Sequence, residues 1–292
     1  MPYKGSKSKI AQQIINILPE AEWFVDLFGG GGAIIDCAMQ SIKWHKGIYN
    51  ELESITYKGF CMAVNGEFHN EKRWISREDF FKLKDSDPYV AMCFSFGNDL
   101  KTYCYAREIE PWKKALHYAR VQKDYSKLER MGIKSDGSRK DIVKHKDLYR
   151  QKYLDWLGKN VILPEEFERL QNEERLQNLE SLQRLQRLQR LNLSYEKVDI
   201  PDNAVIYCDI PYKQTNTYLS DFDHEKFYEW ALKQEQNVFI SEYDMPDDFY
   251  LVTEFDRTSL LSPNSRETMK EKLYCNHEYK IDEQLSLFQT EI

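Results

Sequence analysis

The tetrapeptide Asp209-Ile210-Pro211-Tyr212 carries the residue types most suited to chemistry in this chain. It directly follows the apolar run Ala204–Cys208, which has the composition of a buried strand. A carboxylate, a backbone carbonyl held by a proline and an aromatic face at the tip of a strand can together hold an amino group on a planar heterocycle. The tetrapeptide therefore indicates chemistry on a nucleobase, although the same residues after a strand also form ordinary turns.

A second informative segment lies earlier, where the apolar run Trp23–Phe28 meets four glycines, Gly29–Gly32. A strand that breaks into glycines before a helix lets backbone approach a nucleotide-like ligand closely, because no Cβ atoms intervene. The spacing is neither G-x-G-x-x-G nor that of a phosphate-binding G-K-[ST] loop, which disfavours a dinucleotide or triphosphate. Glu51 follows the next expected strand, Gly47–Tyr49, where an acid can accept hydrogen bonds from ribose hydroxyls or serve as a solvated cap.

These segments require an α/β scaffold, in which buried strands alternate with helices. We expect strands over 22–28, 47–49, 192–198, 204–208, 237–241 and 250–256, helices over 7–18, 33–39 and 223–234, and helical structure over 52–90 with a boundary at Asp87-Pro88. Residues 91–105 alternate like strands around a Gly97-Asn98 turn. Strands on both sides of the middle predict one parallel-rich core interrupted by an inserted domain.

The middle of the chain differs in charge from the rest. The whole chain carries −7, yet residues 101–192 hold 21 lysines and arginines against 14 acids, a net of +7, so the remainder carries −14. A basic region beside an acidic body suits an enzyme that touches phosphates with one face, and it also fits a solvated helical surface. We expect basic helices up to Asn160, interrupted by an exposed loop at 135–140 whose cations could contact phosphates.

Leucines recur every three residues from Leu176 to Leu191, with Gln-Arg between the later ones. A step of three residues makes the leucines spiral around a helix, so no coiled-coil seam results. The strong helix formers Gln, Arg, Leu and Glu favour a helix over 176–193, with an extended repeat as the alternative. We interpret the tract as a spacer.

Bulk properties narrow the class of protein. A chain of 292 residues can bury a full core, and it contains no apolar stretch of 18 residues and no signal-type N-terminus, so we expect a cytoplasmic protein. The six cysteines and six histidines are scattered without ligand spacing, which predicts reduced thiols and no metal site. We expect a monomer.

In motif order and spacing the chain resembles the Dam-like (D12 class) DNA adenine-N6 methyltransferases. Residues 1–10 are similar to that family's N-terminal aromatic-x-G-G-K segment, residues 26–32 to its F-x-G-x-G motif, and residues 209–212 to its D-P-P-Y motif. Ser95–Asn98 resemble the family loosely, and residues 262–266 through 273–274 resemble its closing segment. Three departures stand out: Ile210 for proline, Tyr3 for the common tryptophan, and Ser6 for the second glycine.

The resemblance implies a Rossmann-like core that uses S-adenosylmethionine, with an inserted, mainly helical target-recognition domain. The core would comprise residues 1–60 and 195–292, and the insertion residues 61–194. The implied reaction moves a methyl group to N6 of an adenine flipped out of double-stranded DNA, in a bacterial cell or a phage-infected host. The implied catalytic residues are Asp209, Pro211 and Tyr212, and the implied cofactor-binding residues are Tyr3, Lys7, Asp26, Phe28, Gly29, Gly31, Glu51 and Asp209.

Other functions remain open at this point. Transfer to cytosine N4 or to RNA would use the same amine-holding groups. Because Ile210 departs from the family motif, a catalytically impaired DNA-binding relative is a further alternative. The recognition sequence and the biological role of the methylation are not readable from the residues.

Overall fold

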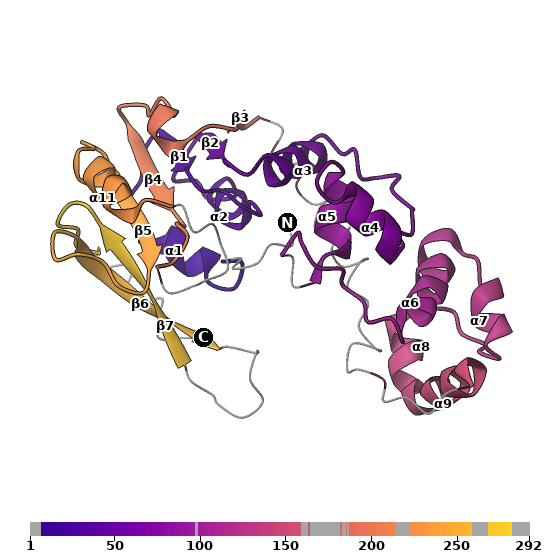
Figure 1. The fold of residues 1–292 in the computed structure, drawn as a ribbon. Coiled ribbons are helices and arrows are strands. Elements are labelled where there is room, and N and C mark those ends of the chain that lie inside the picture. The colour runs from indigo at the N-terminus through magenta and orange to yellow at the C-terminus, as the bar shows by residue number, and fades with distance from the viewer. Residues whose placement is uncertain are drawn as a thin grey trace. The chain divides into compact units, whose positions relative to one another are not determined.

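The structure of the chain is a computed structural model, and it describes residues 7–96, 99–158, 163, 182, 185, 187–213, 222–258 and 268–281. Its backbone divides into two compact units (Figure 1). Unit 1 comprises residues 1–4 and 58–183, and unit 2 comprises residues 5–57 and 184–292. Within the described ranges, none of the helices has both the length and the apolar character needed to cross a bilayer.

Unit 2 is built on a seven-stranded sheet with the order β3-β2-β1-β4-β5-β7-β6. The first five strands in this order pair in parallel, whereas β7 runs antiparallel to both β5 and β6. The strands are β1 (Trp23–Asp26), β2 (Lys46–Asn50), β3 (Gln189–Leu191), β4 (Ala204–Cys208), β5 (Asn237–Glu242), β6 (Tyr250–Thr258) and β7 (Thr268–Cys275). This mostly parallel α/β sheet is compatible with a methyltransferase fold, as the sequence predicted.

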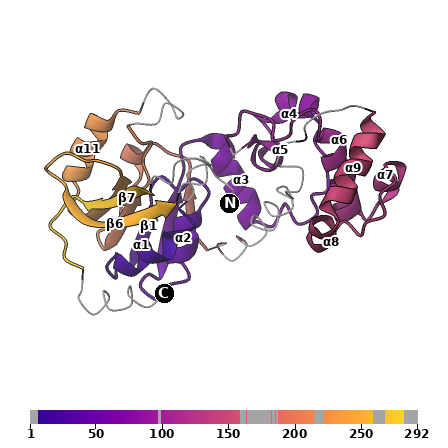
Figure 2. The same ribbon diagram turned by 90° about the horizontal axis from the view of Figure 1, so that it is seen from below.

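Helices cover both faces of the sheet (Figures 1 and 2). On one face, the described core contains Val25, Ile48, Ile206 and Val238 together with Phe227 of helix α11. The other face is covered by α1 and α2, and the carboxylate of Asp26 accepts a hydrogen bond from the backbone N–H of Ile35 in α2. These helices are α1 (Ala11–Ile17), α2 (Ala33–Ala38) and α11 (His224–Leu232).

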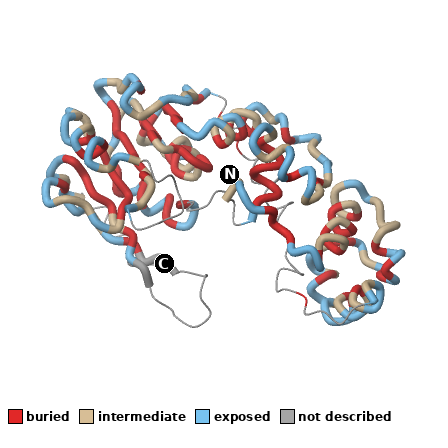
Figure 3. Tube along the Cα trace, in the orientation of Figure 1, coloured by how far each residue is buried: buried red, intermediate tan, exposed pale blue. Residues whose placement is uncertain are grey.

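Burial explains why the parallel strands read as continuous apolar runs. All five residues of β4 are buried, and red segments follow the strands of unit 2 in Figure 3. Strands enclosed on both faces lose the alternation of polar and apolar residues that marks a half-exposed strand. The predicted strands 22–28, 47–49, 204–208, 237–241 and 250–256 are confirmed, as are the helices at 7–18, 33–39 and 223–234.

The described part of unit 1 is mainly helical. Asp87 caps α5 by accepting hydrogen bonds from the N–H groups of Tyr89 and Val90, and Pro88 fills the first helical position, so the predicted boundary is confirmed. Helix α3 spans the boundary between the units in the chain. The elements are α3 (Ser54–Val64), α4 (Arg77–Leu83), α5 (Pro88–Phe94), α6 (Glu110–His117), the π-helical turn η2 (Tyr118–Gln122), α7 (Ser126–Arg130), α8 (Arg139–Lys144) and α9 (Lys146–Leu157).

Three local predictions are wrong. The strand expected from residue 91 is helical up to Phe94, because α5 is buried at all seven positions and therefore shows no helical periodicity. Only an isolated antiparallel bridge between Ser95 and Tyr103 remains of it in the described chain, and Gly97-Asn98 lie outside the described residues.

The other two errors concern neighbouring segments. The helix expected over 176–193 ends differently, since Gln189–Leu191 form the edge strand β3 beside β2; most of the leucine tract lies outside the described residues. The strand expected at 192–198 is instead the short 3-10 helix η5, Tyr195–Lys197. Pairing with β2, which no local pattern reveals, selects the extended form for the tract's last residues.

The loop predicted at 135–140 is exposed only in part, because Gly137 is buried.

Candidate active site

The sheet topology itself marks a site. Successive strands β1, β2 and β3 extend the sheet in one direction, and β4 then returns to the opposite side of β1. At such a reversal, the loops beyond the carboxyl ends of the two central strands diverge and leave room for a ligand. Asp26 at the end of β1 is paired in register with Tyr207 of β4, two residues before Asp209. The parallel pairing therefore brings the glycine loop and the tetrapeptide to the same edge of the sheet.

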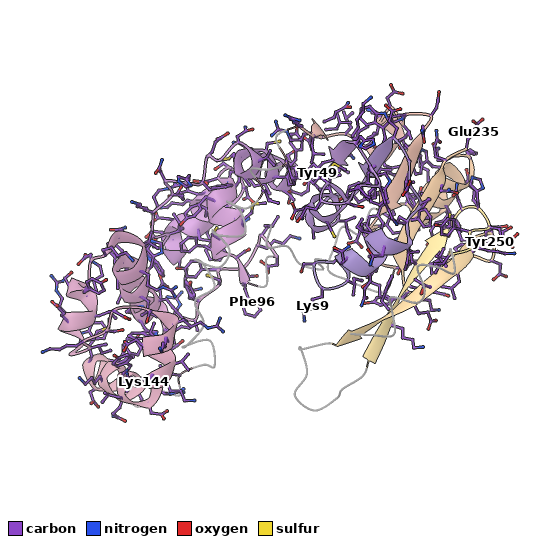
Figure 4. The ribbon with its side chains drawn as sticks, turned by 180° about the vertical axis from the view of Figure 1, so that it is seen from behind. Lys9, Tyr49, Phe96, Lys144, Glu235 and Tyr250 are labelled. Carbon is purple, nitrogen blue, oxygen red and sulfur yellow. The ribbon has the colours of Figure 1, made fainter. Side chains whose placement is uncertain are left out.

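The glycine loop after β1 is shaped by close packing on β2. A Cβ atom on Gly29 would lie 2.3 Å from Cε2 of Tyr49, so only glycine fits against this buried ring. The Tyr49 hydroxyl also donates a hydrogen bond to the carbonyl of Gly30 (2.7 Å; Figure 4 labels Tyr49). Gly32 has φ 74° and starts α2 in the left-handed conformation that glycine favours. The Tyr49 ring thus accounts for the requirement for glycine at position 29, and the turn into α2 accounts for it at position 32.

Two acids accept backbone hydrogen bonds from the glycine loop and from the segments next to it. Glu51 accepts hydrogen bonds from the backbone N–H groups of Gly30 and Glu53, both at 2.8 Å. Asp26 accepts one from Ile35 at 3.1 Å. Burial raises the pKa of Asp26 to about 8, the Ile35 hydrogen bond opposes the shift, and Asp209 and Glu51 add to it. Burial likewise raises the pKa of Glu51 to about 7, against its backbone hydrogen bonds.

The tetrapeptide is anchored from several sides. The ring of His224, at the start of α11, donates from Nε2 to the carbonyl of Pro211 (2.7 Å). Ile210 is 2% exposed and belongs to the core on the α11 face of the sheet, so the residue that departs from the family motif contributes apolar burial. The Tyr212 ring meets that of Tyr243 edge to face, with 4.7 Å between the centroids.

Lys7 connects the N-terminal segment with the tetrapeptide. Its ammonium lies 2.6 Å from Oδ1 of Asp209 and 2.9 Å from Oε1 of Glu271, and 4.9 Å from the centroid of the Tyr212 ring. The hydroxyl of Tyr212 donates to the same Glu271 oxygen at 2.6 Å. Burial disfavours the charged lysine, but Asp209 and Glu271 outweigh it and raise the pKa of Lys7. Burial and the same two carboxylates raise the pKa of Tyr212, which keeps its hydroxyl protonated.

Two carboxylates of this site escaped the sequence analysis. Glu242 ends β5 at the same edge as Asp209; burial raises its pKa to about 7, and its oxygens accept hydrogen bonds from the N–H groups of Tyr243 and Lys213. In the sequence, Glu242 follows the apolar strand Val238–Ile240 just as Asp209 follows Ala204–Cys208, so its position indicated a site residue equally well. Glu271 in β7 is fully buried. The sequence indicated this residue less clearly: Glu271 lies on the same face of its strand as the apolar residues Leu273 and Cys275, which are buried.

The structure brings together most of the residues that the sequence predicted for the site. Lys7, Asp209 and Tyr212 are in direct contact, and Gly30 links the glycine loop to Glu51. Phe28 instead packs within an aromatic cluster, with centroids 5.6 to 5.8 Å from Phe227, Tyr195 and Phe222. Gly31 is buried in the glycine loop. Tyr3 and the closing segment 262–266 lie outside the described residues. Within the described chain, no cluster of three His, Cys, Asp or Glu side chains is arranged to hold a metal ion.

Comparison with known protein families gives a match to part of the chain. The family model for D12 class N6 adenine-specific DNA methyltransferases matches residues 3–131, which include Lys7, the glycine loop and Glu51 and end before Asp209. A comparison with curated proteins gives no match. The family model thus agrees with the resemblance found in the sequence, and residues 3–131 of this chain match the D12 class N6 adenine-specific DNA methyltransferases, a family of enzymes.

Proposed function

We propose that this protein transfers a methyl group from S-adenosylmethionine to N6 of an adenine in double-stranded DNA. The observation that carries the proposal is the pairing of β1 with β4, which puts the amine-holding tetrapeptide beside the glycine loop of the matched family region. Catalytic roles are proposed for Asp209, Pro211 and Tyr212.

The residues at the carboxyl edge of the sheet fit the proposed cofactor chemically. S-adenosylmethionine supplies a methyl group on a positively charged sulfonium when it is bound. Several carboxyl groups lie at this edge of the sheet, and the negative charge of those that are ionised suits a cation. These groups are Asp26, Glu51, Asp209, Glu242 and Glu271, with Lys7 between two of them.

Glu51 is the proposed partner of the cofactor's ribose. A carboxylate has about four acceptor positions, and its bonds to Gly30 and Glu53 leave capacity for a hydroxyl donor. Gly29 and Gly31 would admit the cofactor closely, while Asp26 and Phe28 would support the loop. Lys7 and Tyr3 are proposed to border the cofactor on the side of the N-terminal segment.

Asp209 and the backbone carbonyl of Ile210 would accept hydrogen bonds from the adenine amino group. The lone pair of this nitrogen is delocalised into the ring, so two acceptors that favour a tetrahedral nitrogen stabilise the transition state more than the ground state. Extrusion of the base from the duplex costs a few kcal/mol. Stacking on Tyr212 would return about 1 to 3 kcal/mol.

DNA is the proposed macromolecular partner, and unit 1 offers a surface for it. A hollow of about 700 Å³ is lined by the cations Arg77, Arg107 and Lys114, the acids Glu78 and Glu110 and the half-exposed Phe81, and Arg77 forms an ion pair with Glu110. A neighbouring hollow shares Arg77 and Arg107 and includes Phe96, which is 55% exposed beyond the end of α5 (Figure 4). Cations beside exposed aromatic rings suit phosphates and bases. We propose that unit 1 provides target recognition.

The test is methyl transfer from labelled S-adenosylmethionine to mixed-sequence duplex DNA, followed by mass spectrometry of the nucleosides. N6-methyladenine is the expected product, and N4-methylcytosine or transfer to RNA alone would contradict the proposal. DNA binding without any transfer would indicate a non-catalytic relative. Sequencing of the methylated positions would then give the recognition sequence.

Asp209→Ala is expected to abolish methyl transfer while DNA affinity stays within about threefold, because Asp209 acts on the amino group and not on phosphates. Asp202→Ala, in the exposed turn before β4, is the matched control and should keep full activity. Near-normal turnover of the Asp209 variant would exclude the assigned role.

A further inference from the structure

The lysine at the proposed catalytic site lies between two carboxylates of unequal exposure. The Lys7 side chain is 3% exposed, and its ammonium contacts Asp209, which is 25% exposed, and Glu271, which is not exposed at all. Asp209 can therefore be reached by a ligand or by water, whereas Glu271 cannot. The two acids are thus suited to different tasks.

Asp209 already receives an amino-type donor in this structure. The Lys7 ammonium, 2.6 Å from Oδ1, stands where the proposed function requires the adenine amino group to donate. If the target amine takes over this acceptor, the ammonium loses a partner in a buried place. A buried charge without its partner is strongly unfavourable, so another acceptor must hold it.

Glu271 has the position for that second task. Its Oε1 atom lies 2.9 Å from the Lys7 ammonium and accepts the Tyr212 hydroxyl at 2.6 Å. It is fixed in β7, where its residue pairs with Phe255 of β6. One oxygen thus contacts both the ammonium beside Asp209 and the aromatic ring proposed to stack on the base.

We infer that Glu271 is a positioning residue: it is the permanent counter-ion of Lys7, and it retains the ammonium while Asp209 exchanges Lys7 for the amino group of the target base. The inference rests on the proposed function for its second half. Its first half, the division of labour between two carboxylates, concerns the protein alone and is tested without substrate. Methyl transfer is not needed to measure it.

The first experiment measures urea unfolding of Glu271→Gln, Asp209→Asn and Lys7→Met, singly and in the two pairs that include Lys7. Glu271→Gln should lower the ratio of folded to unfolded protein about a hundredfold or more, because the buried ammonium then loses its enclosed carboxylate and keeps the partly exposed Asp209. Asp209→Asn should lower it less than tenfold, since water can reach that position. Equal losses for the two variants would overturn the inference.

The double variants decide the matter even if Glu271→Gln fails to fold. Adding Lys7→Met to Glu271→Gln removes the ammonium that has lost its enclosed partner and should restore stability, whereas adding it to Asp209→Asn leaves the buried Glu271 without Lys7 and should not. A double variant as unstable as Glu271→Gln alone would contradict the assignment. Glu254→Gln is the matched control, because its exposed ion pair with Lys270 joins the same two strands at 2.8 Å; its expected loss is under about fivefold.

The second experiment addresses the reaction. In Glu271→Gln, turnover should fall about ten- to a hundredfold while KM for S-adenosylmethionine stays constant, and Glu271→Asp should recover part of the loss. Unchanged turnover, or a loss seen only in KM for S-adenosylmethionine, would refute the positioning role. If the unaltered protein transfers no methyl group at all, the proposed function fails, and the unfolding experiments still decide which acid is the counter-ion.

Discussion

At the scale of single residues, the site is defined by acids whose surroundings differ more than their chemistry does. Asp26 accepts a hydrogen bond from helix α2, and Glu51 accepts one from the glycine loop. Asp209 pairs with Lys7 while partly exposed, and Glu271 is fully buried. Burial disfavours ionisation, so protons should leave Asp26 and Glu51 near neutral pH.

Affinity for the cofactor should depend on the ionisation of Glu51. Because the carboxylate is the better acceptor for ribose hydroxyls, affinity for S-adenosylmethionine should rise with pH and level off above the pKa of about 7. Glu51→Gln should weaken binding about ten- to a hundredfold and flatten the pH profile. Isothermal titration calorimetry between pH 6 and 8 measures both effects. The exposed Glu22→Gln serves as control, and a Glu51→Gln profile that matches the unaltered protein would rule out this contact.

Folding stability should decline with pH because of Asp26. The folded pKa of about 8 lies above the ordinary 3.8, so the unfolded chain releases this proton first as pH rises. Between these values each pH unit costs up to about 1.4 kcal/mol, and the loss levels off above pH 8. Asp26→Asn keeps an acceptor for Ile35 and cannot ionise, so it should gain on the unaltered protein from pH 5 to 8. Urea unfolding across this range gives the difference, and a constant difference would argue that Asp26 is ionised in the fold.

At the scale of elements, the antiparallel β7 changes how the sheet ends. It enters between β5 and β6, contributes Glu271 to the site, and leads into Asn276. The Asn276 amide accepts a hydrogen bond from the N–H of Val238 and donates to the carbonyls of Ala231 and Gln236. One buried side chain therefore joins the end of α11, the start of β5 and the end of β7.

Loss of this junction should destabilise unit 2. Asn276→Ala leaves buried backbone groups without partners and should cost about 2 to 4 kcal/mol in the free energy of unfolding. Glu278→Ala alters a nearby exposed residue and should stay within about 0.5 kcal/mol. Chemical denaturation measures both variants. Equal effects would mean that the Asn276 hydrogen bonds do not carry the junction.

At the scale of the whole molecule, charge is distributed unevenly along the chain. The −14 outside residues 101–192 suits a site that attracts a cation, whereas the +7 within them suits a polyanion. Two of the cations that line the hollow in unit 1, Arg107 and Lys114, belong to this basic stretch. We therefore locate the proposed DNA contacts in unit 1.

Removal of these cations should reduce the salt dependence of DNA binding. For Arg107→Ala combined with Lys114→Ala, the slope of log affinity against log salt should become shallower by about 0.9 for each lost phosphate contact. Fluorescence anisotropy with labelled duplex DNA gives this slope. Lys233→Ala, an exposed cation of unit 2, is the control, and Arg139→Ala with Lys140→Ala tests the loop favoured by the sequence. A change confined to the loop variant would transfer the contacts to residues 135–140.

The amino-acid sequence was enough to predict the alternation of strands and helices in unit 2 and most residues of the candidate site. Buried strands such as 204–208 are apolar throughout, and glycines, a capped Asp87-Pro88 and terminal acids are signals that neighbouring residues supply locally. The local patterns misread 91–94 and 189–198, because complete burial removes periodicity and because β3 owes its extended form to hydrogen bonds with β2.

Which acids come together at the candidate site depends on the tertiary fold. Lys7 and Glu271 are 264 positions apart, and their contact depends on β7 reversing direction between β5 and β6, which no property of either residue encodes. The same holds for Gly29, whose missing Cβ is required by the ring of Tyr49 on the next strand. Local propensity specifies elements, whereas the free energy of burying a charge or a ring depends on everything that surrounds it, and that is known only once the chain has folded.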